Sequence, residues 1–246
     1  MSLKSIFREQ FPRAFFLDGK DMISLETYLN SRDRLSDKEK IIAASKPGEG
    51  NMNYVLRITT NHRSFIIKQA RPWVEKYPQI PAPVERSVVE STFLQKAQEE
   101  KELSAFSPKI LWSDPDNFIL AMEDLGEATD YTFLYKKENK FGTSDLENAT
   151  KYLKILHGLP IDRFPENAKM RKLNHEHIFD FPFQKKNGLD LDQTQKGLNA
   201  VAAPFKTDGF LKNKIQRLGA IYLAQGRCLI HGDFYPGSWL KSPAGI

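Results

Sequence analysis

The sequence predicts an α+β fold in two lobes, a small antiparallel sheet lobe followed by a mostly helical lobe. Short apolar stretches separated by turn residues recur between residues 41 and 122, which is typical of antiparallel strands. After Gly126 the apolar residues are spaced at helical intervals instead. We therefore expect an N-terminal lobe over residues 1–124 and a partial helical C-terminal lobe over residues 125–246.

The N-terminal lobe is expected to begin with helices and to continue as a five-stranded sheet. Leu25, Tyr28 and Leu29 have the spacing of one helix face, and Ser24 before them is a candidate N-cap. A helix over about residues 84–100 follows two prolines and is inserted before the fourth strand. The expected strands cover residues 41–44, 54–58, 64–68, 109–112 and 118–122.

The second lobe contains two stronger helix signals and one irregular stretch. Ser144 and Glu147 form the Ser-x-x-Glu pattern of a capping box, which predicts a helix with Leu146 on its inner face. Residues 165–204 are polar and have only weak helix signals. A last helix follows and is expected to end with Gly226 at its C′ position.

The composition is that of an ordinary globular chain, with 40% hydrophobic and 27% charged residues. No apolar run is long enough to cross a membrane, the N-terminus lacks a secretory signal, and Cys228 is the single cysteine. These features predict a cytoplasmic protein with no membrane partner. The oligomeric state is not revealed, and a homodimer is left open.

The chain is moderately basic, with a net charge of +5 and an isoelectric point near 9.1. Such a value raises nucleic-acid binding as an alternative function. However, the basic residues are interleaved with acids, as in Lys38-Glu39-Lys40, so we expect no nucleic-acid partner. A mild positive field also suits an anionic ligand such as a nucleotide.

A glycine-rich turn, Gly48-Glu49-Gly50-Asn51, separates the first two expected strands. Glycines let backbone amides approach phosphate groups closely, which makes this turn a candidate phosphate-binding loop. It is not a Walker A loop, because no Gly-Lys-Ser/Thr follows and the next element is a strand. Taken alone, the pattern favours an ordinary hairpin turn.

Lys68 and Glu90 form the second candidate feature. A lysine at a strand end, such as Lys68, is usually a surface residue. Glu90 falls inside the apolar stripe of the inserted helix, and a carboxylate that faces the protein needs a cation. We therefore expect the two to form an ion pair that holds the ammonium against nucleotide phosphates, rather than two unrelated surface charges.

The third feature is His231-Gly232-Asp233, which follows an apolar pair near the end of the chain. One fixed aspartate on such a loop can orient a substrate hydroxyl and take its proton, so Asp233 is the candidate catalytic residue. His231 is expected to brace the loop. The alternative is a surface turn, and His-Gly-Asp in place of His-Arg-Asp argues against a protein kinase.

In this order the motifs resemble the aminoglycoside phosphotransferase/choline kinase superfamily, which has a protein-kinase-like fold. Within it the chain is most similar to the methylthioribose kinases, through Lys68-Gln69-Ala70-Arg71-Pro72 and through a loop that ends in Gly237-Ser238. The likeness covers roughly residues 40–240. It implies transfer of the γ-phosphoryl group of ATP, with Mg²⁺, to a hydroxyl of a small molecule such as a methylthioribose-type sugar.

The resemblance also implies roles on the nucleotide side. Asn51 and the glycines of the turn, Gly48 and Gly50, would lie over the ATP phosphates, and Lys68 with its partner Glu90 would contact them. The backbone of a hinge would meet the adenine. The implied hinge residues are Met122, Glu123 and Asp124.

On the acceptor side, Asp233 would bind the hydroxyl, with His231 and Ser238 supporting the loop. Most of the superfamily has Asn where Ser238 stands, although methylthioribose kinases also have Ser. The acidic Mg²⁺ motif would lie beyond Ile246, so the metal ligands are unknown and we expect a C-terminally truncated, inactive kinase. Alternatives are a nucleotide-binding pseudokinase or interaction module, and a kinase for an aminoglycoside- or choline-like acceptor.

Overall fold

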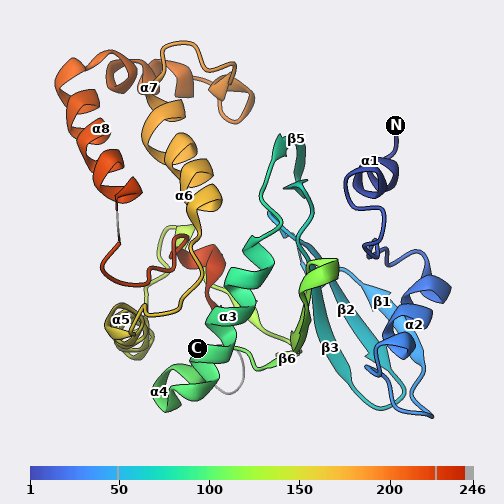
Figure 1. The fold of residues 1–246 in the computed structure, drawn as a ribbon. Coiled ribbons are helices and arrows are strands. Elements are labelled where there is room, and N and C mark those ends of the chain that lie inside the picture. Colours follow the sequence, from blue (N-terminus) through green and yellow to red (C-terminus); the bar gives the residue numbers. More distant parts are fainter. Residues whose placement is uncertain (49, 225, 242–246) are drawn as a thin grey trace. The chain divides into compact units, whose positions relative to one another are not determined.

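A computed structural model describes residues 1–48, 50–224 and 226–241 of the chain (Figure 1). The chain divides into two compact units. Unit 1 comprises Met1–Pro165 together with Cys228–Ile246, and unit 2 comprises Glu166–Arg227. The lobe boundary expected after residue 124 lies within unit 1 and stays a prediction.

Unit 1 is built around a five-stranded antiparallel sheet in the order β1-β2-β3-β7-β6, and its strands lie where the sequence predicts them. β7 lies between β3 and β6, and its Met122 pairs with Ile66 on one side and with Ile110 on the other. The end of β7 is therefore fixed from both sides. The strands are β1 (Ile41–Ser45), β2 (Tyr54–Thr60), β3 (Ser64–Gln69), β6 (Ile110–Asp114) and β7 (Ile119–Glu123).

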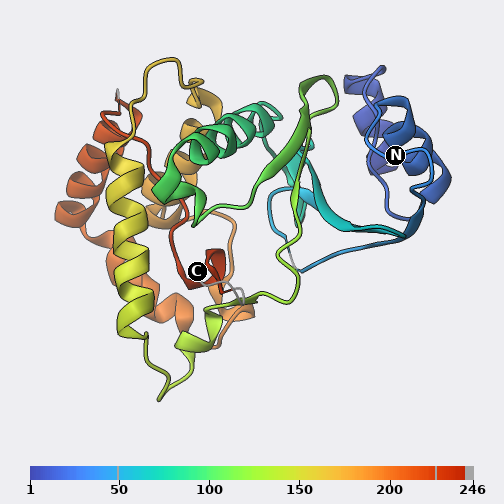
Figure 2. The same cartoon turned by 90° about the horizontal axis from the view of Figure 1, so that it is seen from below.

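The two faces of the sheet carry different helices, as Figure 2 shows. Leu56, Ile58 and Ile67 belong to the core that contains the buried residues of the N-terminal helices. Met122 packs on the opposite side with Leu94 of α3. Because successive side chains of a strand alternate between faces, Lys68 shares the α3 face. The helices are α1 (Leu3–Gln10), α2 (Met22–Ser31), α3 (Arg86–Glu99) and α4 (Lys101–Ser104).

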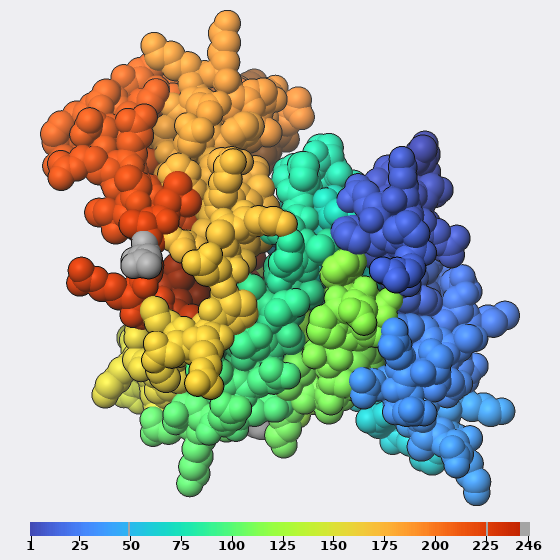
Figure 3. Space-filling view, viewed as in Figure 1, coloured from blue at the N-terminus to red at the C-terminus, as the bar shows by residue number. Residues whose placement is uncertain are grey.

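The segment between α1 and α2 is attached to the sheet by Gln69, a residue with 0% exposure. Its Oε1 accepts a hydrogen bond from Leu17 N at 2.9 Å, and its Nε2 donates to Phe15 O at 2.6 Å and Asn117 O at 3.0 Å. In the space-filling view the N-terminal residues, in blue, form a continuous surface with the sheet lobe (Figure 3). Gln69 thus makes the first residues of the chain part of this lobe.

Two predicted helix starts differ from those in the structure. α2 is capped by Asp21, whose carboxylate accepts from Ser24 N at 3.2 Å, so Ser24 is not the N-cap. α5 (Thr143–Gly158) begins one residue before Ser144, which therefore lies inside the first turn, and the expected capping box is wrong. Leu146 is 51% exposed rather than on the inner face.

The hairpin formed by β4 (Trp73–Val74) and β5 (Tyr77–Pro81) was not expected, because its prolines are typical helix-start or turn signals. β8 (Thr129–Asp130) pairs with β9 (Leu240–Lys241), which joins the segment after the sheet to the end of the described chain. Across the described residues, no helix is both long and apolar enough to cross a membrane.

Unit 2 is helical and includes the stretch expected to be irregular. Arg171 of α6 donates to the carbonyl oxygens of Tyr222 at 3.1 Å and Leu223 at 2.5 Å, which satisfies the end of α8. The last helix is capped by Ala224, so Gly226 lies two residues beyond the cap and is not at C′. The helices are α6 (Ala168–His175), α7 (Leu198–Thr207) and α8 (Gly209–Leu223).

Candidate active site

The glycine-rich turn connects β1 to β2, and all of it except Glu49, which lies outside the described residues, has a defined path. Gly48, Gly50 and Asn51 are exposed, so the turn is open to a ligand. Its second half is held by the β4–β5 hairpin, because Lys76 N donates to Asn51 O at 3.0 Å. The proposed contacts of these residues with phosphates stay a prediction.

Lys68 and Glu90 form the ion pair that the sequence predicts, with 2.8 Å between Lys68 Nζ and Glu90 Oε1. The second carboxylate oxygen of Glu90 accepts from Asn53 Nδ2 at 3.3 Å. The Lys68 and Glu90 side chains are 27% and 28% exposed. The pair is thus held by the protein but is not sealed from solvent, which leaves the ammonium able to bind an anion.

The side chains of the expected hinge residues are buried or hydrogen-bonded to other parts of the protein. Met122 is buried, and the Glu123 carboxylate accepts from Lys109 N at 2.8 Å. Asp124 pairs with Arg57, whose Nε lies 2.8 Å from Asp124 Oδ2. Any contact with adenine at this segment therefore falls to main-chain groups.

The His-Gly-Asp loop has a defined hydrogen-bonded form. Gly232 has a φ of 81°, a left-handed conformation in which glycine carries no penalty. Asp233 N donates to His231 Nδ1 at 3.3 Å, and Ser238 Oγ donates to Asp233 Oδ2 at 3.3 Å. The Asp233 residue is exposed, so its carboxylate is both oriented by the loop and accessible.

Comparison with known proteins finds relatives that are similar in sequence and a solved structure that is similar in fold. No family model matches the chain. Methylthioribose kinase of Bacillus mycoides (strain KBAB4) is 25% identical over 225 residues, which cover 85% of this chain and 55% of the relative. The corresponding enzyme of Bacillus cereus (strain B4264) is 26% identical over 239 residues, covering 90% of this chain and 58% of the relative. The chain thus spans about half the length of the curated relatives it matches.

A crystal structure of LicA in complex with AMP shares the fold, with a TM-score of 0.51 and 15% identity over 90% of this chain and 64% of that one. The likeness in sequence to methylthioribose kinases and in fold to LicA supports the aminoglycoside phosphotransferase/choline kinase superfamily, which the sequence motifs also resemble. Its α+β architecture is the protein-kinase-like fold of that superfamily. The fold class expected from the sequence is confirmed, and the expected family agrees with these likenesses.

The His-Gly-Asp loop is supported by aromatic packing that the sequence did not reveal. Phe234 stacks on Tyr152 of α5, with ring centroids 5.7 Å apart and planes at 4°. His231 contacts both rings edge-on. Tyr131 N also donates to Pro236 O at 3.0 Å. Because these partners lie about 80 to 100 positions away from the loop, local sequence patterns could not identify them.

His231 is exposed as a residue, but its ring is partly buried against its aromatic neighbours. This burial lowers the pKa of His231 below its usual value, while the Asp233 carboxylate opposes the shift. A neutral ring agrees with the hydrogen bond from Asp233 N, because Nδ1 can accept only when it carries no proton. His231 therefore acts as an acceptor that fixes the loop.

The structure brings the predicted residues together in two clusters within unit 1. One contains Lys68, Glu90 and Asn53, which follows the glycine turn, and the other contains His231, Asp233 and Ser238. That both clusters border one nucleotide cleft stays a prediction. Among residues 1–48, 50–224 and 226–241, no group of three or more His, Cys, Asp or Glu side chains could hold a metal ion.

The structure adds Arg86 and Asn53 to the first cluster. Arg86 Nε donates to Asn53 Oδ1 at 2.8 Å, and Arg86 lies four residues before Glu90 on α3. The sequence signal that could have identified Arg86 is its i, i+4 spacing from Glu90, because residues four apart share a helix face.

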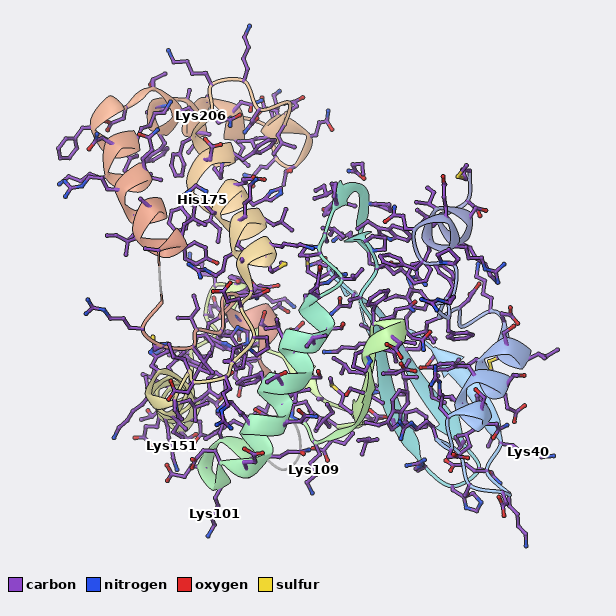
Figure 4. The ribbon with its side chains drawn as sticks, viewed as in Figure 1. Lys40, Lys101, Lys109, Lys151, His175 and Lys206 are labelled. Carbon is purple, nitrogen blue, oxygen red and sulfur yellow. The ribbon has the colours of Figure 1, made fainter. Side chains whose placement is uncertain are left out.

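The basic side chains of unit 1 come from separate elements. Lys40 precedes β1, Lys101 begins α4 and Lys151 lies on α5, and all three are exposed (Figure 4). Lys151 pairs with Glu102 at 3.3 Å. These positions agree with the interleaved charges of the sequence.

Proposed function

We propose that the chain carries the ATP-binding part and the catalytic loop of a small-molecule kinase. The kinase transfers the γ-phosphoryl group of ATP to a hydroxyl of a methylthioribose-type sugar. The observation that carries the proposal is the half-buried Lys68–Glu90 ion pair, which accepts a hydrogen bond from Asn53, two residues after the glycine turn. Its support is the likeness to methylthioribose kinases.

On the nucleotide side, the Lys68 ammonium binds the phosphates as a point charge. Glu90 holds the ammonium at 2.8 Å and so limits its rotamers before the ligand arrives. Gly50 N already donates to Gly48 O at 3.1 Å, so the backbone of the exposed residue Asn51 is the better placed to approach phosphate oxygens. The main chain beyond β7 meets the adenine, because the side chains of Glu123 and Asp124 are already hydrogen-bonded.

On the acceptor side, Asp233 accepts the hydrogen bond of the substrate hydroxyl and takes its proton as the new O–P bond forms. Ser238 and the neutral His231 hold the carboxylate and its backbone in one orientation. Little other covalent chemistry is required of the protein, since phosphoryl transfer depends mainly on alignment and charge stabilisation.

Bound Mg²⁺ would supply charge neutralisation for the phosphates. The Asp233 carboxylate and the Ser238 hydroxyl, 3.3 Å apart, are oxygen donors of the type that Mg²⁺ prefers. Mg²⁺ commonly takes one or two carboxylates from the protein and completes its shell with phosphate and water, so these two groups fit part of such a site.

The experiment is an ATP-consumption assay with a panel of methylthioribose, aminoglycosides, choline and simple sugars. Turnover with methylthioribose that is abolished by Asp233→Ala and retained by Asp116→Ala supports the proposal and shows that the inactivity expected from the sequence is wrong. ATP binding in a thermal-shift assay, with no turnover of any acceptor, would select a nucleotide-binding module instead. No ATP binding with or without Mg²⁺ would overturn both.

A further inference from the structure

Arg86, the first residue of α3, is a buried cation that donates hydrogen bonds to five neutral oxygen atoms. The residue is 7% exposed, and burial lowers the pKa of its guanidinium to about 10. A buried charge is costly unless a dense set of hydrogen bonds replaces its hydration. Arg86 has five such bonds, to Pro83 O (2.7 Å), Asn53 Oδ1 (2.8 Å), Arg71 O (2.9 Å), Met52 O (2.9 Å) and Trp73 O (3.4 Å).

Two of these acceptors, Met52 O and Asn53 Oδ1, belong to the last residues of the turn before β2. Arg86 therefore fixes the position at which the glycine turn enters the sheet. It also fixes the orientation of the Asn53 side-chain amide. Because Arg86 donates to the amide oxygen, the amide nitrogen points away from Arg86 and donates to another acceptor. That nitrogen donates to Glu90 Oε2 at 3.3 Å.

Glu90 completes the path to Lys68. It lies one helical turn after Arg86, on the same face of α3, and uses its two oxygens separately. Oε2 accepts from Asn53, and Oε1 accepts from Lys68 at 2.8 Å. A continuous set of hydrogen bonds thus runs from Arg86 through Asn53 and Glu90 to the ammonium of Lys68.

We propose that Arg86 is a positioning residue for the phosphate-binding site: it orients Asn53, and through it the Lys68–Glu90 pair, toward the nucleotide phosphates. The inference rests on the proposed function of this cluster. A lysine would not substitute, because one ammonium cannot supply the planar array of donors that reaches five acceptors around it.

The test measures binding of ATP and of adenosine to the full chain by calorimetry, at a temperature at which far-UV circular dichroism shows each variant folded. The variants are Arg86→Lys, Asn53→Ala and the double variant. Lys68→Met serves as the positive control. Arg63→Lys is the matched control, because Arg63 is also an arginine held by several hydrogen bonds, to Glu39 and to Arg34 O, but it lies at the opposite end of the β2–β3 hairpin from Lys68.

We expect Arg86→Lys and Asn53→Ala each to weaken ATP binding by about tenfold. Adenosine binding should stay unchanged, because adenosine has no phosphates. The double variant should lose about as much as either single variant, as residues on one path do. A general loss of structure would weaken adenosine binding as well, and Asn53→Ala covers the case in which Arg86→Lys does not fold.

Two outcomes separate the inference from the proposed function. If Lys68→Met weakens ATP binding but Arg86→Lys and Asn53→Ala do not, the positioning role is overturned and the phosphate site stands. If the unaltered chain binds ATP no better than adenosine, the proposed phosphate site itself fails.

Discussion

Arg57 on β2 reaches over β3 to form an ion pair with Asp124, with its Nη2 2.9 Å from Asp124 Oδ1 and its Nε 2.8 Å from Oδ2. The Asp124 side chain is only 5% exposed. Arg57 Nη2 also donates to Gly126 O at 3.0 Å, so one guanidinium fixes the segment that leaves the sheet. Burial alone would raise the pKa of Asp124, but its hydrogen bonds, chiefly from Arg57, outweigh burial and hold this pKa below its ordinary value.

The Arg57–Asp124 ion pair stabilises the position of the chain where it leaves β7, so this position depends on the charge of the Asp124 carboxylate. Asp124→Asn should lower the free energy of unfolding by about 2 kcal/mol, because it leaves the Arg57 charge without its anionic partner. Urea denaturation measures this change. Asp116→Asn is the control, since Asp116 is exposed in a turn of the same lobe. Equal unfolding free energies for the two variants would contradict a stabilising role for the pair.

Glu39 predicts how the stability of unit 1 depends on pH. Burial by itself would raise its pKa, but hydrogen bonds from Arg63, Ser36 N and Thr60 outweigh burial and lower the pKa to about 2. Because the folded state has the lower pKa, the stabilisation is complete above the unfolded value of 4.5 and is lost as the pH falls from there toward 2. The Glu39 side chain is 4% exposed, and the shift corresponds to about 3 kcal/mol.

Urea titrations between neutral pH and pH 2 measure the effect. The unaltered chain should lose stability steeply below pH 4.5. Glu39→Gln should be less stable at neutral pH, and its stability should depend less on pH over the same range. Parallel pH curves for the two proteins would assign the acid sensitivity to other carboxylates.

Lys68→Met should weaken ATP binding by tenfold or more, because it removes the charged hydrogen-bond donor expected to contact the phosphates. It also leaves the half-buried Glu90 carboxylate without its cation, which would repel the nucleotide. Calorimetric titration with ATP measures the loss. Lys40→Met, at an exposed lysine, is the control (Figure 4). Unchanged binding in Lys68→Met would remove this lysine from the proposed site.

The pKa of His231 reports the contacts within the His-Gly-Asp loop. Burial lowers it and the Asp233 carboxylate raises it, so Asp233→Asn should lower this pKa further. Since the folded pKa is depressed below its usual 6.5, the bond from Asp233 N to Nδ1 is retained above that pH and is lost as the pH falls through the folded pKa.

Proton NMR titration of the His231 ring tests this. Asp116→Asn should leave the ring's titration unchanged. A rise in the His231 pKa on Asp233→Asn would mean that the two side chains do not interact as the structure indicates.

The parts of the site that the sequence predicted are those encoded by periodicity within one element. The strand expected to end in Lys68 follows from the short apolar run Phe65-Ile66-Ile67 beside a turn, and the inward orientation of Glu90 follows from its angle on a helix. The remaining contacts depend on which distant segments meet. Nothing near Asn53 in the sequence indicates that its amide lies between Arg86 and Glu90.

Boundaries were harder to predict than elements, for a local reason. Ser24 and Asp21 are both good N-cap residues, and the choice depends on where the chain leaves its previous contacts. The β4–β5 hairpin contains Pro78 and Pro81, which suppress a strand prediction although an edge pair tolerates them.

Gln69 is an example of a residue whose role becomes visible only in the folded chain, and it gives the sharpest stability prediction. Gln69→Leu fills a similar volume but leaves Leu17 N, Phe15 O and Asn117 O without their side-chain partner. Each unpaired buried group costs about 1–3 kcal/mol, so we expect a loss of several kcal/mol in the free energy of unfolding. Residues 11–19 should also become more sensitive to protease, because Gln69 makes the hydrogen bonds that join Phe15 and Leu17 to β3.

The matched control is Gln98→Leu, because Gln98 makes one bond, to Ile110 O at 3.2 Å, and does so at an exposed position. Urea denaturation and limited proteolysis of both variants compare the same chemical change in a buried and an exposed setting. Gln98→Leu should stay within about 0.5 kcal/mol of the unaltered chain. If Gln69→Leu is equally mild, the first residues must be held to the sheet by other contacts, which include the hydrogen bonds from Arg71 Nη2 to Leu17 O at 2.5 Å and from Gly19 N to Tyr54 Oη at 3.1 Å and the packing of the buried Leu17 and Phe7 side chains.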